Sequence, residues 1–515
     1  MKEKIALLRN VALVAMASYV ESAVGLLAGV LIARTLGPTD YGHYAFGIWL
    51  CGALIMAGNN ALPTSSIKFL AEARGAGRED VAQALVQRFL RLQLISSGLV
   101  LGIFVIAMIV RPVSDWSEQL PLFLGIAVVA VWSRAGFWMR GAISKGYELF
   151  VPENASLALT AIANLVLVVV LAWKGATVAQ FFAAYAVLGL FSNILVRLLL
   201  RRMGVSAVAG SIPDELNRRL RKHLVLTGIM MLLVVATNKA VEMTLLKAYT
   251  SPETVGYFAI AGALTKGAVE ILAGGMAAVL LPAMARRFGE GGAESLGRML
   301  AESTRMYWFV GLAIAGLGLT VSEGLVHLLY GQRYEGAIPA LMWHLVVAGF
   351  VVVNGAAAAV LTASDRQIDR IRVILCALIV NLIAGFLLIP RFGLPGAIAS
   401  FAITQLCDTA ISWWYAHRRT NVKLPFGPMA RLLAAGAIAT ALGYLTAESM
   451  HLKLAFIGGA LVFTTVYLTL SVLLRTWRVG DFEVIANVIG RLPKVGRALS
   501  PRVLSLQRFA MAETA

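Results

Sequence analysis

Long apolar stretches recur through the chain, and the short connections between them carry most of its charge. About fourteen of these stretches run for roughly 20 residues, the length that an α-helix needs to cross a bilayer. Charged residues make up 14% of the 515 residues, whereas a soluble globular chain carries about 25%. We therefore expect an all-α polytopic membrane protein with spans near 10–33, 41–62, 89–110, 120–142, 155–173, 178–199, 224–249, 255–281, 304–329, 338–363, 371–389, 395–416, 429–447 and 454–475.

Positive charges are distributed unevenly between the two sides of the membrane that these spans define. When residues at span ends are counted with the adjacent connection, 35 of the 45 Lys and Arg residues lie on the side of the N-terminus, seven on the other side and three near span centres. Cytoplasmic loops carry an excess of Lys and Arg, so this bias places both termini in the cytoplasm. The net charge of +18 is therefore a topology signal, and we expect no nucleic-acid partner.

A ten-residue segment occurs twice, and each copy joins two apolar stretches. GPTDYGHYAF at 37–46 corresponds to SPETVGYFAI at 251–260, 214 positions later, with Pro, Gly, an aromatic residue and Ala in matching places. Further pairs at nearly the same offset are Asn164 with Asn381 and Leu62–Pro63 with Leu281–Pro282. The pattern indicates an old duplication of a membrane-spanning half, which is typical of transporters with a substrate site between the halves.

The offset predicts two pseudo-symmetric parallel lobes of six spans each, because an even number of spans returns the chain to the same side of the membrane. The expected organisation is a first lobe at 1–200, a basic cytoplasmic linker at 201–223, a second lobe at 224–417, two additional helices at 429–475 and a basic amphipathic cytoplasmic tail at 476–515. The tail either lies on the anionic inner leaflet or is solvated and partly disordered.

Five ionisable residues fall near the centres of predicted spans when positions are counted at about 1.5 Å per residue. They are Glu21, Arg134, Lys239, Lys266 and Asp408, and two further acids, Glu242 and Glu270, each lie one turn from a lysine. A charge at the centre of a bilayer costs about 2.5–3.5 kcal/mol on insertion scales. We expect a folded bundle to keep such residues where they line a water-filled path.

Structural roles for these polar residues remain open. Lys239 with Glu242 and Lys266 with Glu270 have the spacing of ion pairs on one helix face, so each pair could neutralise itself. Arg140 lies near a span end, where we expect its long side chain to reach the interface. Hydrogen bonding between helices is the alternative role for the asparagines within spans, which are Asn164, Asn193, Asn354 and Asn381.

The signs of the central charges favour an anionic substrate. Three central cations can bind an anionic group in a water-filled cleft, especially a pyrophosphate. A cleft for a cationic drug is expected to carry acids alone, and carboxylates in transport paths commonly couple transport to a proton or sodium gradient. The candidate substrate-binding residues are Arg134, Lys239, Lys266, Glu242 and Glu270, and the candidate ion-coupling residues are Glu21 and Asp408.

Motifs of enzymes and of metal sites are absent from the sequence. It contains no His-Glu-x-x-His zinc motif, no glycine-rich phosphate loop and no Gly-x-Ser-x-Gly nucleophile motif. The three cysteines, Cys51, Cys376 and Cys407, fall within spans and have neither disulfide nor metal-ligand spacing. We expect no enzymatic activity, catalytic residue, cofactor or metal. The outer connections, of at most about ten residues, leave no room for an external domain.

Four segments carry a resemblance to a known family. They are ARTLGPTDYGHYAF at 33–46, TLLKAYTSPETVGYFAIAGAL at 244–264, LLYGQRYEGAIPAL at 328–341 and NLIAGFLLIPRFGLPGAIAS at 381–400. In order and spacing they resemble the Wzx-type polysaccharide transporters, the oligosaccharide flippases of the multidrug/oligosaccharidyl-lipid/polysaccharide flippase superfamily. One departure is Glu242, where such sequences often place an aspartate.

This resemblance implies a V-shaped, two-lobed fold that works by alternating access. The implied cargo is an undecaprenyl-diphosphate-linked oligosaccharide, moved from the inner to the outer leaflet of a bacterial cytoplasmic (inner) membrane. Such transport serves the synthesis of exopolysaccharide, lipopolysaccharide O-antigen or capsule. The expected partners are membrane lipids, a proton or sodium counter-ion, glycosyltransferases and a glycan polymerase.

Three other functions remain open. A flippase for the lipid-linked peptidoglycan precursor would share the fold, the charges and the carrier lipid. An ion-coupled small-molecule exporter of the same superfamily is disfavoured by the central Lys and Arg and by fourteen spans instead of twelve. An integral-membrane glycan polymerase or ligase would need a sizeable outer loop with catalytic groups, which the short outer connections do not provide.

Overall fold

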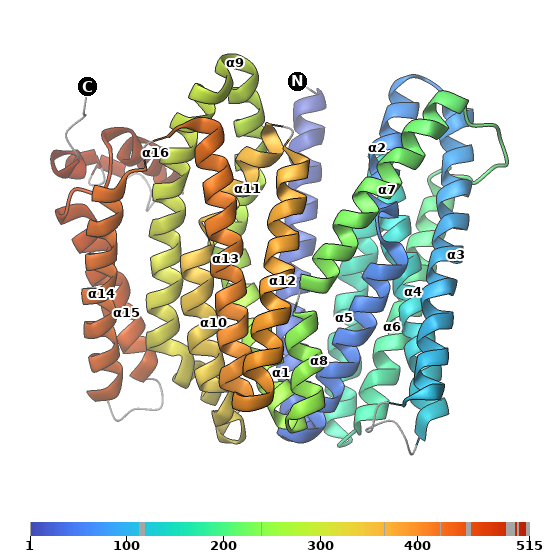
Figure 1. The fold of residues 1–515 in the computed structure, drawn as a ribbon, viewed down its shortest axis with the longest axis horizontal. Coiled ribbons are helices and arrows are strands. Elements are labelled where there is room, and N and C mark those ends of the chain that lie inside the picture. Colours follow the sequence, from blue (N-terminus) through green and yellow to red (C-terminus); the bar gives the residue numbers. More distant parts are fainter. Residues whose placement is uncertain are drawn as a thin grey trace. The chain divides into compact units, whose positions relative to one another are not determined.

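The computed structural model describes every residue except 1, 113–118, 238, 365, 423, 450–454, 491–499, 502–503 and 511–515. The described residues are almost entirely α-helical and include no strand (Figure 1). Twelve helices among them are long and apolar enough to cross a membrane. The fold class, an all-α polytopic membrane protein, is therefore confirmed. The number of fourteen crossings and the side on which the termini lie stay predictions.

Each predicted span overlaps one helix or two consecutive helices of the structure. The first helices are α1 (Lys2–Asn59), α2 (Leu62–Gly75), α3 (Glu79–Val110), α4 (Leu120–Gly146), α5 (Val151–Trp173), α6 (Val178–Arg202), α7 (Asp214–Thr237) and α8 (Ala240–Tyr249). They are followed by α9 (Pro252–Leu329), η2 (Gln332–Ala337), α10 (Ile338–Val351), α11 (Asn354–Ala363), α12 (Gln367–Phe392), α13 (Leu394–Thr420), α14 (Phe426–Ser449), α15 (Ala455–Leu473), α16 (Val479–Gly490) and η3 (Leu506–Phe509).

Two of the helices each contain two predicted spans, separated by a break at glycine. In α1 the break is at Gly37, with φ 76° and ψ 173°, and Pro38 begins the helical segment that follows. In α9 the break is at Gly291 and Gly292, where the φ of Gly292 is 58° and its ψ is −147°. Only glycine adopts these conformations without strain, so the glycines fix where one span ends and the next begins.

Two other predicted spans are not continuous helices. The stretch 224–249 is divided into α7 and α8, with Lys239 between them in the left-handed conformation at a φ of 59°. The stretch 338–363 is divided into α10 and α11. Hydropathy did not indicate either division, because it records the length of an apolar run and not whether helical hydrogen bonds continue along it.

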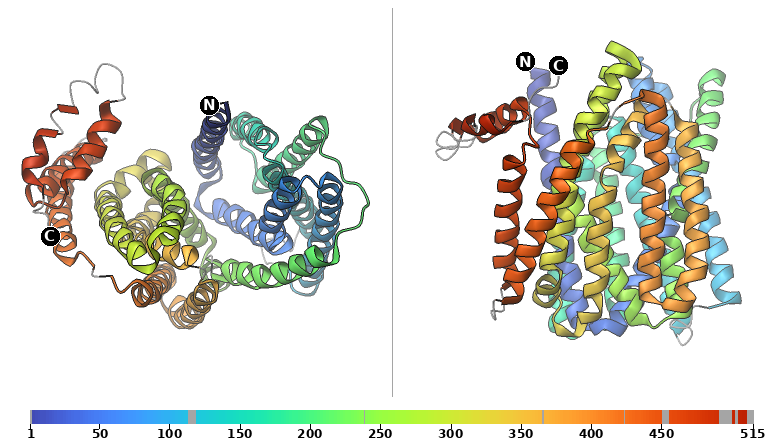
Figure 2. Two further views of the ribbon diagram at one scale, coloured as in Figure 1. Left: turned by 90° about the horizontal axis from the view of Figure 1, so that it is seen from above. Right: turned by 60° about the vertical axis from the view of Figure 1, so that its left-hand side comes forward.

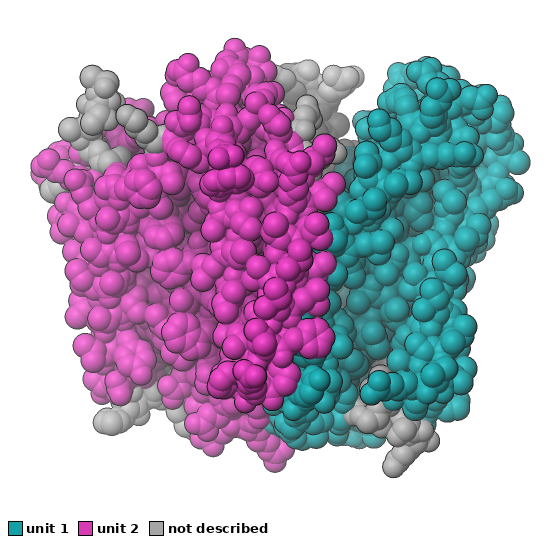
Figure 3. Space-filling model, in the orientation of Figure 1, with its two compact units in different colours: residues 1–256 teal, residues 257–515 magenta. Residues whose placement is uncertain are grey.

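Packing divides the chain into two compact units, Met1–Gly256 and Tyr257–Ala515 (Figure 3). The predicted second lobe begins at 224, so α7 and α8 pack with unit 1 although the duplication assigns them to the other half. A packing boundary reflects which helices contact one another, whereas a duplication boundary reflects where the repeat begins in the sequence. The predicted lobes therefore stay an interpretation of the repeat, and the units are used below for contacts.

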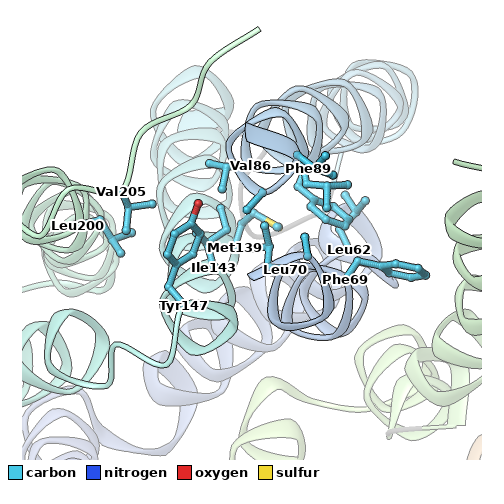
Figure 4. Close-up of a cluster of buried hydrophobic side chains, with 14 of the residues drawn as sticks. Leu62, Phe69, Leu70, Val86, Phe89, Met139, Ile143, Tyr147, Leu200 and Val205 are labelled. Carbon is cyan, nitrogen blue, oxygen red and sulfur yellow. The ribbon is translucent and has the colours of Figure 1, made fainter. Parts of the chain in front are cut away.

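Unit 1 consists of helices that run largely side by side, and it has a dense apolar core at one end (Figures 2 and 4). Phe69 and Leu70 of α2 meet Phe89 of α3 and Met139 of α4 there, all at most 1% exposed. A second cluster in the same unit includes small residues of α4, such as Ala127 and Ala130, together with Cys51 of α1. Small residues let helices approach closely in a membrane protein, where apolar burial alone does not drive association.

The two copies of the repeated segment contact each other within unit 1. Thr39 Oγ1 donates a hydrogen bond to Glu253 Oε1, and these two residues are 214 positions apart. A Cβ atom at Gly42 would lie 1.8 Å from the carbonyl oxygen of Pro252. A Cβ atom at Gly256 would lie 3.3 Å from the carbonyl oxygen of Pro38. Equivalent residues therefore meet one another, and the glycines make this close approach possible.

Unit 2 joins α14 and α15 to α9 through stacked aromatic side chains. The ring of Tyr467 stacks on Phe309 and on Phe463, with ring centroids 5.1 Å and 5.5 Å away. Its hydroxyl donates to the backbone oxygen of Phe309 at 2.9 Å, and the indole Nε1 of Trp308 donates to Met429 O at 3.0 Å. The additional C-terminal helices are thus an integral part of this unit.

The start of the predicted tail is docked on α9 by a buried ion pair. Arg305 Nη2 lies 2.7 Å from Asp481 Oδ2, and the two side chains are 5% and 15% exposed. Arg305 also donates to the backbone oxygen of Thr476. The helix α16 lies at a steep angle to α15 (Figure 2), and its apolar residues Phe482 and Ala486 are buried. The cations at 491–499 lie outside the described residues.

Candidate functional site

A polar pocket of about 280 Å³ lies within unit 1, among α1, α4, α5 and α6. It brings two of the predicted site residues, Glu21 and Arg134, to one cavity although they are on different helices. The full set of polar lining residues is Glu21, Tyr44, Arg134, Thr160, Asn164, Tyr185 and Ser192. The pocket is therefore a place inside the helical bundle where charged and hydrogen-bonding groups converge.

Small residues on α1 create the room for this pocket. Gly25, Ala28, Gly29 and Ile32 recur at the spacing of one helix face and line one wall. A Cβ atom at Gly25 or Gly29 would find no atom within 4 Å, so these glycines face open space. The opposite walls include the aromatic residue Trp138 of α4. A cavity lined on one side mainly by small residues and on another by an aromatic residue can hold a ligand and orient it.

The guanidinium group of Arg134 is held by the aromatic ring of Tyr185. The Cζ atom of Arg134 lies 3.6 Å from the ring centroid, and Nη2 donates to the Tyr185 backbone oxygen at 3.2 Å. A Cβ atom at Gly189, one turn further along α6, would lie 3.0 Å from Arg134 Cγ. None of the ion pairs in the described part of the chain includes Arg134. Its positive charge is therefore positioned but not neutralised by a carboxylate.

Lys239 and Glu242 lie at the break between α7 and α8. Lys239 precedes α8, and Glu242 is in the first turn of that helix and 1% exposed. Lys239 and Glu242 do not share one continuous helix face, because the backbone leaves the helix at Lys239. A carboxylate in the first turn is stabilised by the partial positive charge of a helix N-terminus. Breaks of this kind within spans often border substrate sites in transporters.

Lys266 and Glu270 form an ion pair on α9 in unit 2. The Nζ and Oε1 atoms are 3.6 Å apart, and the side chains are 76% and 51% exposed. The expected i, i+4 contact is thus present. Neither side chain is enclosed within the bundle, so the pair differs from the enclosed Arg134.

Asp408 of α13 accepts a hydrogen bond from the side-chain amide of Asn354 at the start of α11. In the same unit, Asn381 Nδ2 donates to Thr404 Oγ1 at 3.0 Å, which links α12 and α13. Hydrogen bonding between helices is therefore confirmed for Asn354 and Asn381. Asp408 lies in unit 2 and Glu21 in unit 1, and each is described with its own unit.

Arg140 is half-buried and forms a hydrogen bond between α4 and α6. Its Nη1 donates to Asn193 Oδ1 of α6 at 2.8 Å and to the backbone oxygen of Gly136 at 3.1 Å. That the Arg140 side chain reaches the membrane interface stays a prediction. The described residues include no group of His, Cys, Asp and Glu that could hold a metal ion.

The sequence prediction missed Tyr185 and Gly189 of α6, and it named Asn193 for hydrogen bonding between helices but not as the partner of Arg140. Tyr185, Gly189 and Asn193 are spaced four residues apart, so they lie on one face of α6 toward α4. A stripe of small and polar residues at this spacing in an apolar helix was the available signal. It indicates a helix face that meets a partner, but it does not say which one.

Comparison with protein families gives a match to the family described as polysaccharide biosynthesis protein, over residues 7–288. No curated protein sequence matches the chain.

Several solved structures share its fold. The lipid II flippase MurJ, in an inward closed conformation, has a TM-score of 0.67 and 12% identity, covering 89% of this chain and 97% of that one. An inward-facing multidrug resistance MATE family transporter of the MOP superfamily has a TM-score of 0.64 and 15% identity, covering 78% and 94%. A MOP superfamily transporter from Pyrococcus furiosus, for which a reversed polarity of the binding pocket is described, has a TM-score of 0.59 and 15% identity, covering 81% and 95%. At such identities the likeness shows the fold alone.

Proposed function

The chain belongs to the polysaccharide biosynthesis protein family, whose model matches more than half of it, and from this premise we propose that it is a lipid-linked oligosaccharide flippase. Its cargo is an undecaprenyl-diphosphate-linked repeat unit, carried from the inner to the outer leaflet of a bacterial inner membrane. Glycosyltransferases supply this cargo and a glycan polymerase consumes it. The protein itself performs no covalent chemistry.

The observation that carries the proposal is the enclosed, uncompensated cation of Arg134 in the pocket of unit 1. A guanidinium offers planar paired donors that match the oxygens of a diphosphate. Burial strengthens this attraction because water screens it less. The neighbouring Trp138 and Tyr185 provide aromatic surface, which suits sugar rings as well as a cation.

Two carboxylates are proposed to couple transport to an ion gradient. Glu21 lines the same pocket as Arg134, so a change in its protonation alters the field at the substrate. Asp408 is half-buried and bound to Asn354 in unit 2. A proton or sodium ion that binds either carboxylate removes a negative charge from the membrane interior.

A flippase for the lipid-linked peptidoglycan precursor is the second candidate, since the name of one structural neighbour is lipid II flippase. The two candidates share the diphosphate and differ in the glycan. The family match favours a polysaccharide repeat unit.

Transport in proteoliposomes tests the proposal. The full chain is reconstituted with a labelled undecaprenyl-diphosphate oligosaccharide, and the rate at which the glycan becomes accessible to an impermeant reagent is measured. We expect a rate well above that of protein-free vesicles and above that of lipid II. A rate equal to protein-free vesicles for the oligosaccharide lipid would reject the function, and faster transport of lipid II would favour the second candidate.

A further inference from the structure

Three arginines cluster at one end of unit 1, beyond the residues that line the polar pocket. Arg140 is on α4, and Arg197 and Arg201 are one turn apart on α6. Arg140 donates to Asn193 Oδ1 of α6 at 2.8 Å, and Arg197 and Arg201 follow Asn193 four and eight residues later on the same face of that helix. Like charges at this spacing repel one another, so the cluster lowers the stability of the fold unless an anion binds to it.

The fold does not compensate these charges itself. Across the described residues, no ion pair includes Arg140, Arg197 or Arg201. Lys145 on the same helix α4 behaves differently, because its Nζ lies 2.9 Å from Glu153 Oε1. The acceptors bound to Arg140 are neutral, so they orient the guanidinium and leave its charge in place.

The cluster lies further along the length of α4 than the pocket residue Arg134. Arg134 and Arg140 are six residues apart, which corresponds to about 9 Å along a helix axis. Their partners on α6 follow in the same order, Tyr185 for Arg134 and Asn193 for Arg140. Arg197 and Arg201 lie further along α6 in that direction and are exposed. Cations thus follow one another from the exposed end of α6 to the interior pocket.

We propose that Arg140, Arg197 and Arg201 form a phosphate-binding subsite at this end of unit 1, distinct from the pocket at Arg134. The exposed pair on α6 meets the anion first, and the half-buried Arg140 binds it at the edge of the bundle. The ligand is the phosphate or diphosphate group of a lipid. Its identification as the arriving cargo rests on the proposed function, whereas a resident anionic phospholipid offers the same chemistry.

Equilibrium binding to the full chain in phosphatidylcholine nanodiscs tests the subsite. The variants are Arg140→Gln and the double variant Arg197→Gln, Arg201→Gln, and the matched control is Arg202→Gln, the neighbouring exposed arginine of α6. The probes are undecaprenyl diphosphate, phosphatidylglycerol and the uncharged undecaprenol. We expect both variants to lose about tenfold or more in affinity for undecaprenyl diphosphate, because each variant loses charge-assisted hydrogen bonds to the anion. Undecaprenol binding and the control should be unchanged.

The outcomes distinguish a cargo lipid from a resident phospholipid as the ligand. They also distinguish failure of the subsite from failure of the proposed function. Loss of phosphatidylglycerol binding alone would keep the phosphate site and assign it to a resident lipid. Wild-type affinity of both variants for both phosphorylated lipids would overturn the subsite. A wild-type chain that binds phosphatidylglycerol through these arginines but shows no affinity for undecaprenyl diphosphate would count against the proposed function and not against the subsite. Size-exclusion profiles of all variants show whether they fold.

Discussion

Arg134 and Arg140 lie on the same helix, but different groups hold their guanidinium groups. An aromatic ring faces Arg134, and an asparagine side chain binds Arg140. The sequence predicted that Arg134 lies near the centre of its span and made it a candidate site residue. Tyr185 and Asn193 were not identified as partners, because spacing along α6 carries no information about how that helix is rotated against α4.

Replacement of Arg134 tests the role of the enclosed cation. We expect Arg134→Gln to lower transport about tenfold or more without lowering the amount of protein in the membrane, because a charge-assisted contact to the diphosphate is lost. Arg134→Lys should retain part of the activity, since it keeps the charge but loses the planar donors. The control is Arg111→Gln, an exposed arginine at the end of α3. Full transport by a double Arg134→Ala, Lys266→Ala variant, measured by complementation, would contradict the assignment of both residues.

At the scale of helices, apolar runs located the elements but did not predict their breaks. The break at Gly37 falls in the repeated segment and was expected, since Gly and Pro adjoin there. The break at Lys239 was not expected, because no glycine or proline marks it and a lysine adopts a positive φ only when its surroundings enforce it. The buried pair between α9 and α16 was also missed, since Arg305 and Asp481 are far apart in the sequence.

The close approach of the repeated segments predicts that position 42 does not tolerate a side chain larger than that of glycine. We expect Gly42→Ala to lower the free energy of unfolding by about 1–3 kcal/mol, because the added methyl group meets a backbone oxygen that cannot rotate away. Gly256→Ala should lower the free energy of unfolding by less, since the atoms nearest to the added Cβ lie 3.3 Å away. Gly52→Ala on α1 is the control, as its added methyl group has no neighbour within 4 Å. Thermal unfolding in detergent measures all three, and equal melting temperatures for Gly42→Ala and Gly52→Ala would refute this packing.

The docking of α16 predicts that two neighbouring ion pairs contribute very differently to the stability of unit 2. Asp481→Ala leaves the buried Arg305 unpaired and should destabilise unit 2 by about 3–5 kcal/mol. Glu302→Ala removes the partner of Arg478, where both side chains are more than half exposed, and should cost at most about 1 kcal/mol. The measurement is the unfolding transition of each variant. Similar small losses for both would show that α16 adds little to the stability of unit 2.

At the scale of the whole molecule, composition was enough for the fold class, and the apolar runs located the helices. The predicted lobes divide at the linker 201–223 and stay a prediction, whereas the packing units divide at Gly256, which no feature of the sequence indicated. Tertiary contacts decide which unit a helix joins, and they need not follow the borders of a duplication. The V-shaped arrangement and the sidedness of the membrane stay predictions.

Sidedness has a direct test in cysteine labelling. Ser206 and Lys174 are exposed and lie in consecutive connections on opposite sides of the predicted membrane. We expect Lys174→Cys to react with an impermeant maleimide in intact cells, and Ser206→Cys to react only in inverted vesicles, because the positive charges place residues 201–223 inside. The parent chain serves as the baseline for reaction of the native cysteines. The opposite labelling pattern would show that the predicted orientation in the membrane is reversed.

The contact between the two repeated segments has the form of a symmetric dimer interface. Gly42 meets Pro252, Gly256 meets Pro38, and Thr39 faces its own counterpart Glu253. Two identical subunits that meet across a twofold axis make contacts of this reciprocal kind. If the halves arose by duplication, a half-length ancestor already had a surface that fits a second copy of itself. Gene fusion would then have joined a pre-existing homodimer, and each half was afterwards free to acquire its own charges.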